Sequence, residues 1–163
     1  KTIGIIGMGN IGRKVATIAE AFGMKVCYFS TSGTGHCKDY PCLQLEQLLA
    51  ESDIVSIHAP LNERTGGLIG AKELAMMKRT AILVNMGRGA IVDEKAVAEA
   101  VDNGVIAGAG LDVFVTEPLP LDHPYLHMKH PERMSLAPHV AWGSVEARTR
   151  LSSMIADNIA KGW

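Results

Sequence analysis

Short apolar runs alternate along the chain with longer segments whose apolar residues recur at helical spacing. The runs are rich in β-branched residues and nearly continuous in apolar character, as expected for strands buried on both faces of a sheet. We predict strands at 2–7, 25–29, 54–57, 81–85, 106–112 and 134–136, and helices at 11–22, 43–50, 71–77, 93–103 and 143–160. This alternation indicates a parallel sheet with right-handed crossovers, which is a doubly wound α/β fold.

Two segments near the C-terminus stand apart from this alternation. Residues 113–133 contain four prolines and three histidines, and we expect one long loop there. The final helix, 143–160, carries Val145, Ile155 and Ile159 on related turns, so we expect a packing helix there. No repeat, low-complexity tract or internal linker interrupts the chain, and the sequence predicts a single domain.

The first predicted strand ends in GMGNIG, which places Gly7, Gly9 and Gly12 in a GxGxxG pattern. In this setting Gly7 permits a tight turn, Gly9 lets the backbone approach a pyrophosphate, and Gly12 allows close packing of helix on strand. The amides of Asn10 and Ile11 would point at the phosphates from the N-terminus of the following helix. Because the pattern closes a strand and opens a helix, it predicts a Rossmann-type domain that binds a dinucleotide.

The end of the second predicted strand bears on the choice of cofactor. An acidic residue about 20 positions after the glycines usually binds the adenosine ribose of NAD. Ser30 occupies that place here, followed by Thr31 and Ser32, whose hydroxyls could donate hydrogen bonds to a 2′-phosphate. No arginine follows, however, and Lys38 lies several residues further along. The sequence therefore permits NADP as well as NAD and leaves the preference open.

Four chemically active residues fall at, or just beyond, the carboxyl ends of predicted strands, where open α/β sheets bind their ligands. Arg88 lies between two glycines in NMGRGAIVDE, Asp112 ends a strand, and Glu117 and then His139 follow further along. Arg88 is suited to hold a substrate carboxylate, and His139 to protonate a carbonyl oxygen as hydride arrives from nicotinamide. Glu117 would orient the imidazole and favour its protonated form. Asp112 would accept a hydrogen bond from the nicotinamide carboxamide.

Composition narrows the possible partners. The 163 residues are 47% hydrophobic and 20% charged, and the net charge of -1 gives no electrostatic reason to expect nucleic acid or an anionic membrane. No apolar run approaches the roughly 20 residues that span a bilayer. The three cysteines form no CxxC motif and favour reduced thiols in a cytoplasmic protein. His123, His127 and His130 lie in a proline-rich loop that offers no tetrahedral geometry, so we expect no metal.

Five stretches together resemble the successive motifs of one enzyme family. They are GIIGMGNIGR, SDIVSIHAPLNERT, NMGRGAIVDE, GAGLDVFVTEP and APHVAW. Their wording and order are similar to the NAD-binding domain of the D-isomer-specific 2-hydroxyacid dehydrogenases over about residues 1–150. The resemblance implies that Arg88, Glu117 and His139 form the catalytic set. It also implies cofactor contacts, at His58, Ala59, Pro60, Thr65, Asn85, Met86, Gly87, Asp112, His139 and Trp142.

The resemblance also implies an activity, which is hydride transfer between NAD or NADP and a D-2-hydroxy acid or its 2-keto acid. HVAWGS is most similar to the glycerate and hydroxypyruvate reductases, with phosphoglycerate dehydrogenase as the nearest rival. Some relatives act instead as dinucleotide-sensing corepressors, which is the alternative from another class. A sensor has no need of Arg88, Glu117 and His139 together. The stretch NERTGG, residues 62–67, is expected to be a surface loop whose only cofactor contact is Thr65.

The same resemblance predicts a larger assembly. Members of the family insert this domain into a second, substrate-binding domain, and their subunits pair through the nucleotide domain. We therefore expect residues 1–163 to be a fragment of a longer chain and to form a homodimer. Because the second domain closes over the substrate, the fragment alone is expected to turn over substrate poorly or not at all.

Overall fold

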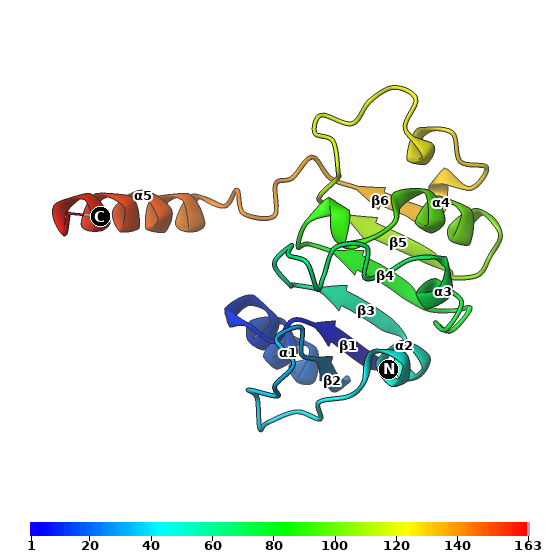
Figure 1. Ribbon diagram of the computed structural model, residues 1–163, viewed down its shortest axis with the longest axis horizontal. Helices are drawn as coiled ribbons and strands as arrows, with labels where there is room; N and C mark the ends of the chain where they lie inside the picture. Colours follow the sequence, from blue (N-terminus) through cyan, green and yellow to red (C-terminus); the bar gives the residue numbers. More distant parts are fainter. Residues whose placement is uncertain (163) are drawn as a thin grey trace.

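Six strands lie side by side in one parallel sheet at the centre of the protein (Figure 1). The computed structural model describes residues 1–162 and gives β1 (Thr2–Ile6), β2 (Lys25–Phe29), β3 (Ile54–Ile57), β4 (Ile82–Asn85), β5 (Gly108–Leu111) and β6 (Met134–Leu136). Their order across the sheet is β2-β1-β3-β4-β5-β6. The strands progress in opposite directions on either side of the β1–β3 neighbours, and doubly wound folds bind ligands at such a switch point. All six predicted strands and the doubly wound α/β prediction are confirmed.

Helices lie on both faces of the sheet. On one face, α1 packs against β1 and β2, where Ile3 and Ile5 meet Ala16 and Ala19. A larger apolar core fills the other face, under α2, α3 and α4. The bounds are α1 (Asn10–Ala21), α2 (Leu45–Glu51), α3 (Ala71–Leu74) and α4 (Glu94–Asp102). Short 3₁₀ turns occur at Gly89–Ile91, Pro124–Leu126 and Pro131–Arg133, the last two within the predicted long loop.

The last helix, α5 (Val145–Ala160), forms where the sequence predicts it but does not pack on the domain. It extends away from the sheet (Figure 1), and none of its residues is buried against residues 1–162. Apolar side chains such as Leu151 and Ile155 are about half exposed. The expected packing is therefore wrong for the described residues. The helix depends on local signals instead, because Ser144 caps its N-terminus by accepting a hydrogen bond from the amide of Ala147 at 3.1 Å.

Loops at the carboxyl edge of the sheet contact one another backbone to backbone. A Cβ atom on Gly12 would overlap the carbonyl oxygen of Gly7, and one on Gly7 would lie 2.8 Å from the amide nitrogen of Ala59. Gly87 is equally close, because its added Cβ would lie 2.8 Å from the carbonyl oxygen of Ala59. Gly7 also has a φ of +95°, a conformation that favours glycine. The loops after β1, β3 and β4 therefore meet with no side chain between them.

Gly89 extends these contacts to the loop after β5. An added Cβ on Gly89 would overlap the backbone carbonyl of Phe114 and the amide of Val115. Arg88 thus lies between two glycines because a neighbouring backbone approaches on each side. The loop that carries Arg88 is held directly against the loop that leads to Glu117.

Replacing Gly89 with alanine should destabilise the fold. Because the added Cβ overlaps backbone and not a movable side chain, we expect Gly89→Ala to lower the free energy of unfolding by about 2 kcal/mol, a usual cost of overpacking. The matched control is Gly110→Ala in β5, where an added Cβ meets nothing within 4 Å. Urea unfolding followed by circular dichroism compares the two variants. Equal midpoints would contradict the close contact at Gly89.

Candidate active site

The imidazole of His139 and the carboxylate of Glu117 form a direct pair. His139 lies after β6 and Glu117 after β5, and the Nδ1–H of His139 donates to Oε2 of Glu117 at 2.8 Å. The other carboxylate oxygen, Oε1, accepts a hydrogen bond from the amide of Phe114 at 2.9 Å. Each of the two side chains is 36% exposed, so both can be reached from solvent. Of the two ring nitrogens, Nε2 is the one that this pairing leaves for another partner.

The backbone around His139 is held in an unusual conformation. His139 has a φ of +54°, and it is the one non-glycine residue within 1–162 with a positive φ. Trp142 donates from Nε1 to the carbonyl oxygen of His139 at 2.8 Å. The buried carboxylate of Asp112 accepts from the amides of Val140 and Ala141, each at 2.8 Å. Asp112 and Trp142 therefore position the loop that presents the imidazole.

Asp112 therefore has a structural role that the sequence did not predict. Its two oxygens each accept one backbone amide, and each keeps a further lone pair. The contact predicted between Asp112 and a nicotinamide carboxamide is compatible with these bonds and stays a prediction.

Arg88 reaches solvent from a loop that a buried side chain organises. Asn85 is fully buried at the end of β4, its Nδ2 donates to the carbonyl oxygen of Arg88 at 3.0 Å, and its Oδ1 accepts from the amide of Gly87 at 3.0 Å. The exposed guanidinium of Arg88 donates from Nη1 to the carbonyl of Gly87 at 2.8 Å. Met86 beside it is 40% exposed. Asn85 therefore holds the Arg88 loop through bonds that use both ends of its amide.

The electrostatics of Glu117 connect these three side chains. The pKa of its carboxyl lies below the ordinary value, first because His139 donates a hydrogen bond to it and next because the amide of Phe114 does. The positive charges of His139 and Arg88 add to this effect. Arg88, Glu117 and His139 follow the carboxyl ends of β4, β5 and β6, so the structure brings the predicted catalytic residues to one edge of the sheet.

A cleft of about 270 Å³ opens between the glycine loop, the end of β2 and the loop after β3. It is lined by Gly7, Met8, Gly9, Tyr28, Ser30, Thr31, Ser32, His36, His58 and Pro60. No side chain within residues 1–162 caps α1, so the amides of Asn10, Ile11 and Gly12 remain available to a phosphate. An added Cβ on Gly9 would meet nothing within 4 Å, which leaves space for a pyrophosphate. The residues present therefore fit a dinucleotide.

Two further predicted cofactor residues have polar atoms engaged within the loops. Thr65 is fully buried, and its hydroxyl donates to the carbonyl of Pro60 at 2.6 Å and accepts from the amide of Asn62 at 2.8 Å. Thr65 thereby stabilises the loop after β3. His58 contacts the hydroxyl of Ser56 at 2.9 Å, and burial lowers its pKa, which favours a neutral ring. Direct contacts of these residues with a cofactor stay a prediction.

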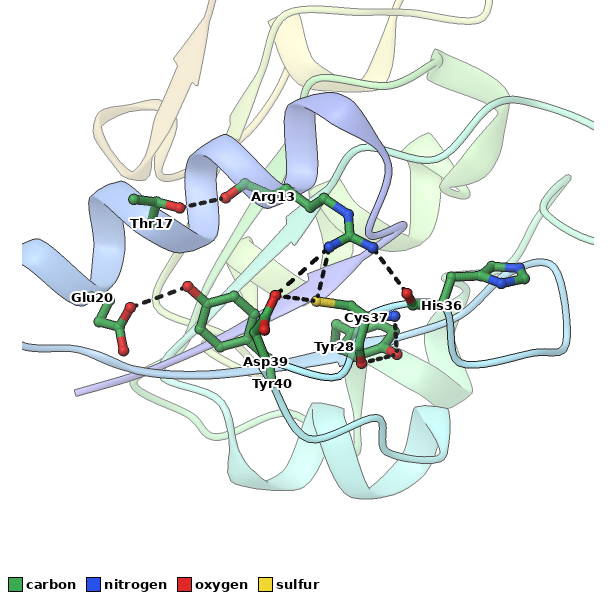
Figure 2. A network of polar contacts seen from close by, with 8 residues as sticks. All are labelled: Arg13, Thr17, Glu20, Tyr28, His36, Cys37, Asp39 and Tyr40. Atoms are coloured by element: carbon green, nitrogen blue, oxygen red, sulfur yellow. Dashed lines mark hydrogen bonds and ion pairs between the residues drawn. The ribbon is translucent and has the colours of Figure 1, made fainter.

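Sequence reasoning missed Arg13, which follows the third glycine of the loop. From α1 its Nη2 donates to the carbonyl oxygen of His36 at 3.0 Å, and its Nη1 donates to Sγ of Cys37 at 3.3 Å (Figure 2). Asp39 lies 3.9 Å from the same Nη1. Arg13 therefore fixes the segment after β2 against α1. The sequence signal for this role was a basic residue in the first turn of α1, opposite a polar loop.

The three histidines of the proline-rich loop have separate partners. Nε2 of the buried His123 lies 3.0 Å from Glu94, and Nδ1 of His130 lies 3.2 Å from Glu132. The ring of His127 contacts a backbone carbonyl at 3.0 Å. Within the described range, no group of three or more His, Cys, Asp or Glu side chains converges as a metal site. No helix of residues 1–162 has the length and apolar character needed to cross a membrane.

The parallel sheet, the glycine loop and the cleft define the class of the protein as a dinucleotide-binding α/β domain. A family model described as the NAD-binding domain of D-isomer specific 2-hydroxyacid dehydrogenases matches residues 1–141. The chain therefore belongs to the D-isomer specific 2-hydroxyacid dehydrogenase family, as the five sequence motifs predict.

Individual relatives agree with this assignment. A glyoxylate reductase of Korarchaeum cryptofilum is 48% identical over 162 residues, which cover 98% of this chain and 48% of the relative. The structure of an NADPH-dependent glyoxylate/hydroxypyruvate reductase from Sinorhizobium meliloti has a TM-score of 0.88 at 34% identity, covering 98% of this chain and 49% of that one. An NAD-complexed family member from Lactobacillus delbrueckii has a TM-score of 0.84 at 32% identity, covering 99% and 53%. The chain spans about half the length of the curated relatives it matches.

The lowered pKa of Glu117 predicts a pH dependence of stability. A carboxyl whose pKa falls on folding stabilises the fold above its ordinary pKa, and this contribution is lost as pH falls through the lowered, folded value. Wild type should therefore be more stable than Glu117→Gln at about pH 7, and the gap should close toward about pH 3. Urea unfolding across this range measures the gap.

The control for this experiment is Glu63→Gln. Glu63 is exposed and makes no hydrogen bond or ion pair with any residue of 1–162, so its replacement should leave stability nearly unchanged at every pH. A gap between wild type and Glu117→Gln that persists undiminished in acid would show that the charged pair is not its cause.

Proposed function

We propose that this domain serves an oxidoreductase that transfers hydride between NAD or NADP and a small D-2-hydroxy acid, reducing glyoxylate or hydroxypyruvate. The observation that carries the proposal is the Glu117–His139 pair, which lies with Arg88 at the same edge of the sheet as the dinucleotide cleft. The printed names of relatives support the substrate class, because glyoxylate reductases and a glyoxylate/hydroxypyruvate reductase are among them. Relatives bound to NAD and dependent on NADPH support either cofactor.

Each of the three side chains has its own part in this reaction. Arg88 is exposed and can bind the substrate carboxylate through two parallel N–H donors. His139 uses Nδ1 to bind Glu117, which leaves Nε2 to deliver a proton to the carbonyl oxygen of the keto acid. Glu117 stabilises the charged imidazole before that transfer. The cofactor, when bound, supplies the hydride for the carbonyl carbon, and in the oxidation direction His139 takes the proton back.

A dinucleotide sensor without catalysis is the second class of function to weigh. The arrangement disfavours it, because a sensor needs neither a general acid nor a carboxylate that orients one. We also propose a homodimer in the cytoplasm, as the family resemblance and the cysteine pattern imply. The partners then are a small 2-hydroxy acid and a second copy of the chain, with no nucleic acid and no membrane.

Replacing His139 with glutamine should remove turnover without removing cofactor binding. Glutamine is not a general acid, so we expect kcat to fall by about 100-fold or more, while the Kd for the reduced cofactor stays close to that of wild type. Because the chain covers 48% of the Korarchaeum cryptofilum glyoxylate reductase, the remainder of that enzyme is supplied in a chimera. Glyoxylate-dependent oxidation of NADH or NADPH measures the rate, and nucleotide fluorescence measures the affinity.

The control variant is His127→Gln, whose ring hydrogen-bonds, within residues 1–162, the backbone carbonyl of Leu121 in its own loop. It should turn over at the rate of the unmodified chimera. Unchanged turnover in His139→Gln would remove His139 from the mechanism. A chimera that binds the nucleotide but reduces neither glyoxylate nor hydroxypyruvate would favour the sensor.

A further inference from the structure

The turn after β2 gathers hydroxyl and imidazole groups at the adenosine end of the cleft. The hydroxyl of Ser30 donates to the carbonyl oxygen of Thr34 at 2.5 Å and lies 3.0 Å from the hydroxyl of Ser32. Nε2 of His36 lies 3.0 Å from Oγ of Ser32 and 2.8 Å from Oγ1 of Thr34. This turn begins where dinucleotide-binding domains place the acidic residue that binds the adenosine ribose. Neutral hydroxyl and imidazole groups therefore stand where a carboxylate is expected.

No carboxylate lines this end of the cleft among the described residues. The turn contributes Ser30, Thr31, Ser32 and His36 to its wall. An adjoining hollow of about 260 Å³ shares Ser30 and Thr31 and likewise has no Asp or Glu in its wall. A carboxylate here would accept hydrogen bonds from the ribose hydroxyls of NAD and would repel a 2′-phosphate. Because the site has no carboxylate, it neither accepts hydrogen bonds from the ribose hydroxyls in this way nor repels a 2′-phosphate.

Arg64 brings a permanent positive charge to the same turn. It lies on the loop after β3, and its Nη1 donates to the carbonyl oxygen of Ser32 at 3.0 Å. The remaining N–H donors of the guanidinium have no partner within residues 1–162, and the residue lines the adjoining hollow with Ser30 and Thr31. Sequence reasoning took this stretch as a surface loop and found no arginine near the turn. The fold supplies one from a different loop.

Arg13 anchors the turn to α1. Its two bonds to the His36 carbonyl and to Cys37 hold the end of the turn against α1, and Figure 2 shows the His36 ring pointing away from this contact. The imidazole and the hydroxyls of the turn are thereby presented from an anchored backbone. Anchoring of this kind lowers the entropy cost of binding a ligand.

We propose that the turn of residues 30–36, together with Arg64, forms a subsite for a 2′-phosphate on the adenosine ribose, so that the chain binds NADPH in preference to NADH. This inference rests on the dinucleotide binding of the proposed function and adds a choice between the two cofactors. On binding, the hydroxyls and the imidazole exchange their contacts within the turn for hydrogen bonds that they donate to the phosphate oxygens. The guanidinium binds the phosphate by a charge-assisted pair, for which arginine is especially suited.

Titration of the 163-residue chain with NADPH and with NADH tests the subsite directly. We expect the Kd for NADPH to be at least about tenfold lower, which corresponds to about 1.4 kcal/mol. The pair 2′,5′-ADP and 5′-AMP should show the same ratio by calorimetry, because the two differ only in the 2′-phosphate. These measurements need no turnover, so they do not depend on a substrate.

Two variants assign the preference to particular residues. Arg64→Gln should reduce the ratio of the two affinities by about tenfold, mainly by weakening NADPH. Ser30→Asp should reverse the preference, because its carboxylate accepts ribose hydroxyls and repels the 2′-phosphate. The control is Lys38→Gln, which removes a cation from the same connection but lies outside both hollows, and it should leave the ratio unchanged.

The outcomes separate this inference from the proposed function. Equal affinities for NADPH and NADH would overturn the subsite and leave the proposed function standing. Binding of neither nucleotide would overturn both. A preference for NADPH that survives Arg64→Gln in full would overturn the part assigned to Arg64.

Discussion

Direct contact between loop backbones at the carboxyl edge of the sheet is the constraint on which the site depends. Gly7, Gly12, Gly87 and Gly89 each face a neighbouring backbone so closely that a Cβ atom would collide with it. The loops after β1, β3, β4 and β5 are thereby brought into a continuous series. Because interiors are close-packed and deform little, each of these loops limits the position of the next. Arg88 projects from the middle of this series.

Buried polar side chains also fix the positions of these loops. The side-chain amide of Asn85 bonds two backbone groups of the loop after β4, and the carboxylate of Asp112 accepts two amides of the loop after β6. The single hydroxyl of Thr65 bonds two backbone groups of the loop after β3. Leaving such buried groups unpaired would cost about 1–3 kcal/mol each, which ties the loop conformations to the fold. The residues proposed to meet substrate, Arg88 and His139, are attached to backbones fixed in this way. The strained φ of His139 is retained for the same reason.

The sequence predicts the sheet well because its signal is local and repeated. Each strand is a short apolar run, and the parallel direction of the strands follows from their alternation with helices. The order of the strands across the sheet was not predicted. The Glu117–His139 pair was predictable too, since both residues follow strands whose ends meet at one edge. The contacts of α5 were not predictable. Its apolar stripe indicates a face that packs on another surface, but it does not show where that surface is. The partners of Asn85 and Asp112 depend on loop geometry that no spacing along the chain records.

The position of Arg64, at the cofactor end of the site, could not be predicted from the sequence either. It is separated from Ser32 by the whole of α2 and β3, and its approach to the turn depends on β2 and β3 flanking β1 in the sheet.

The order of the strands also separates the two ends of the site. The turn after β2 and the loop after β5 are four strands apart, which is roughly 20 Å at the usual strand spacing. Changes that far apart with no shared partner act independently. The fold therefore allows the cofactor preference at one end of the edge to change while the pair that moves the proton at the other end stays as it is.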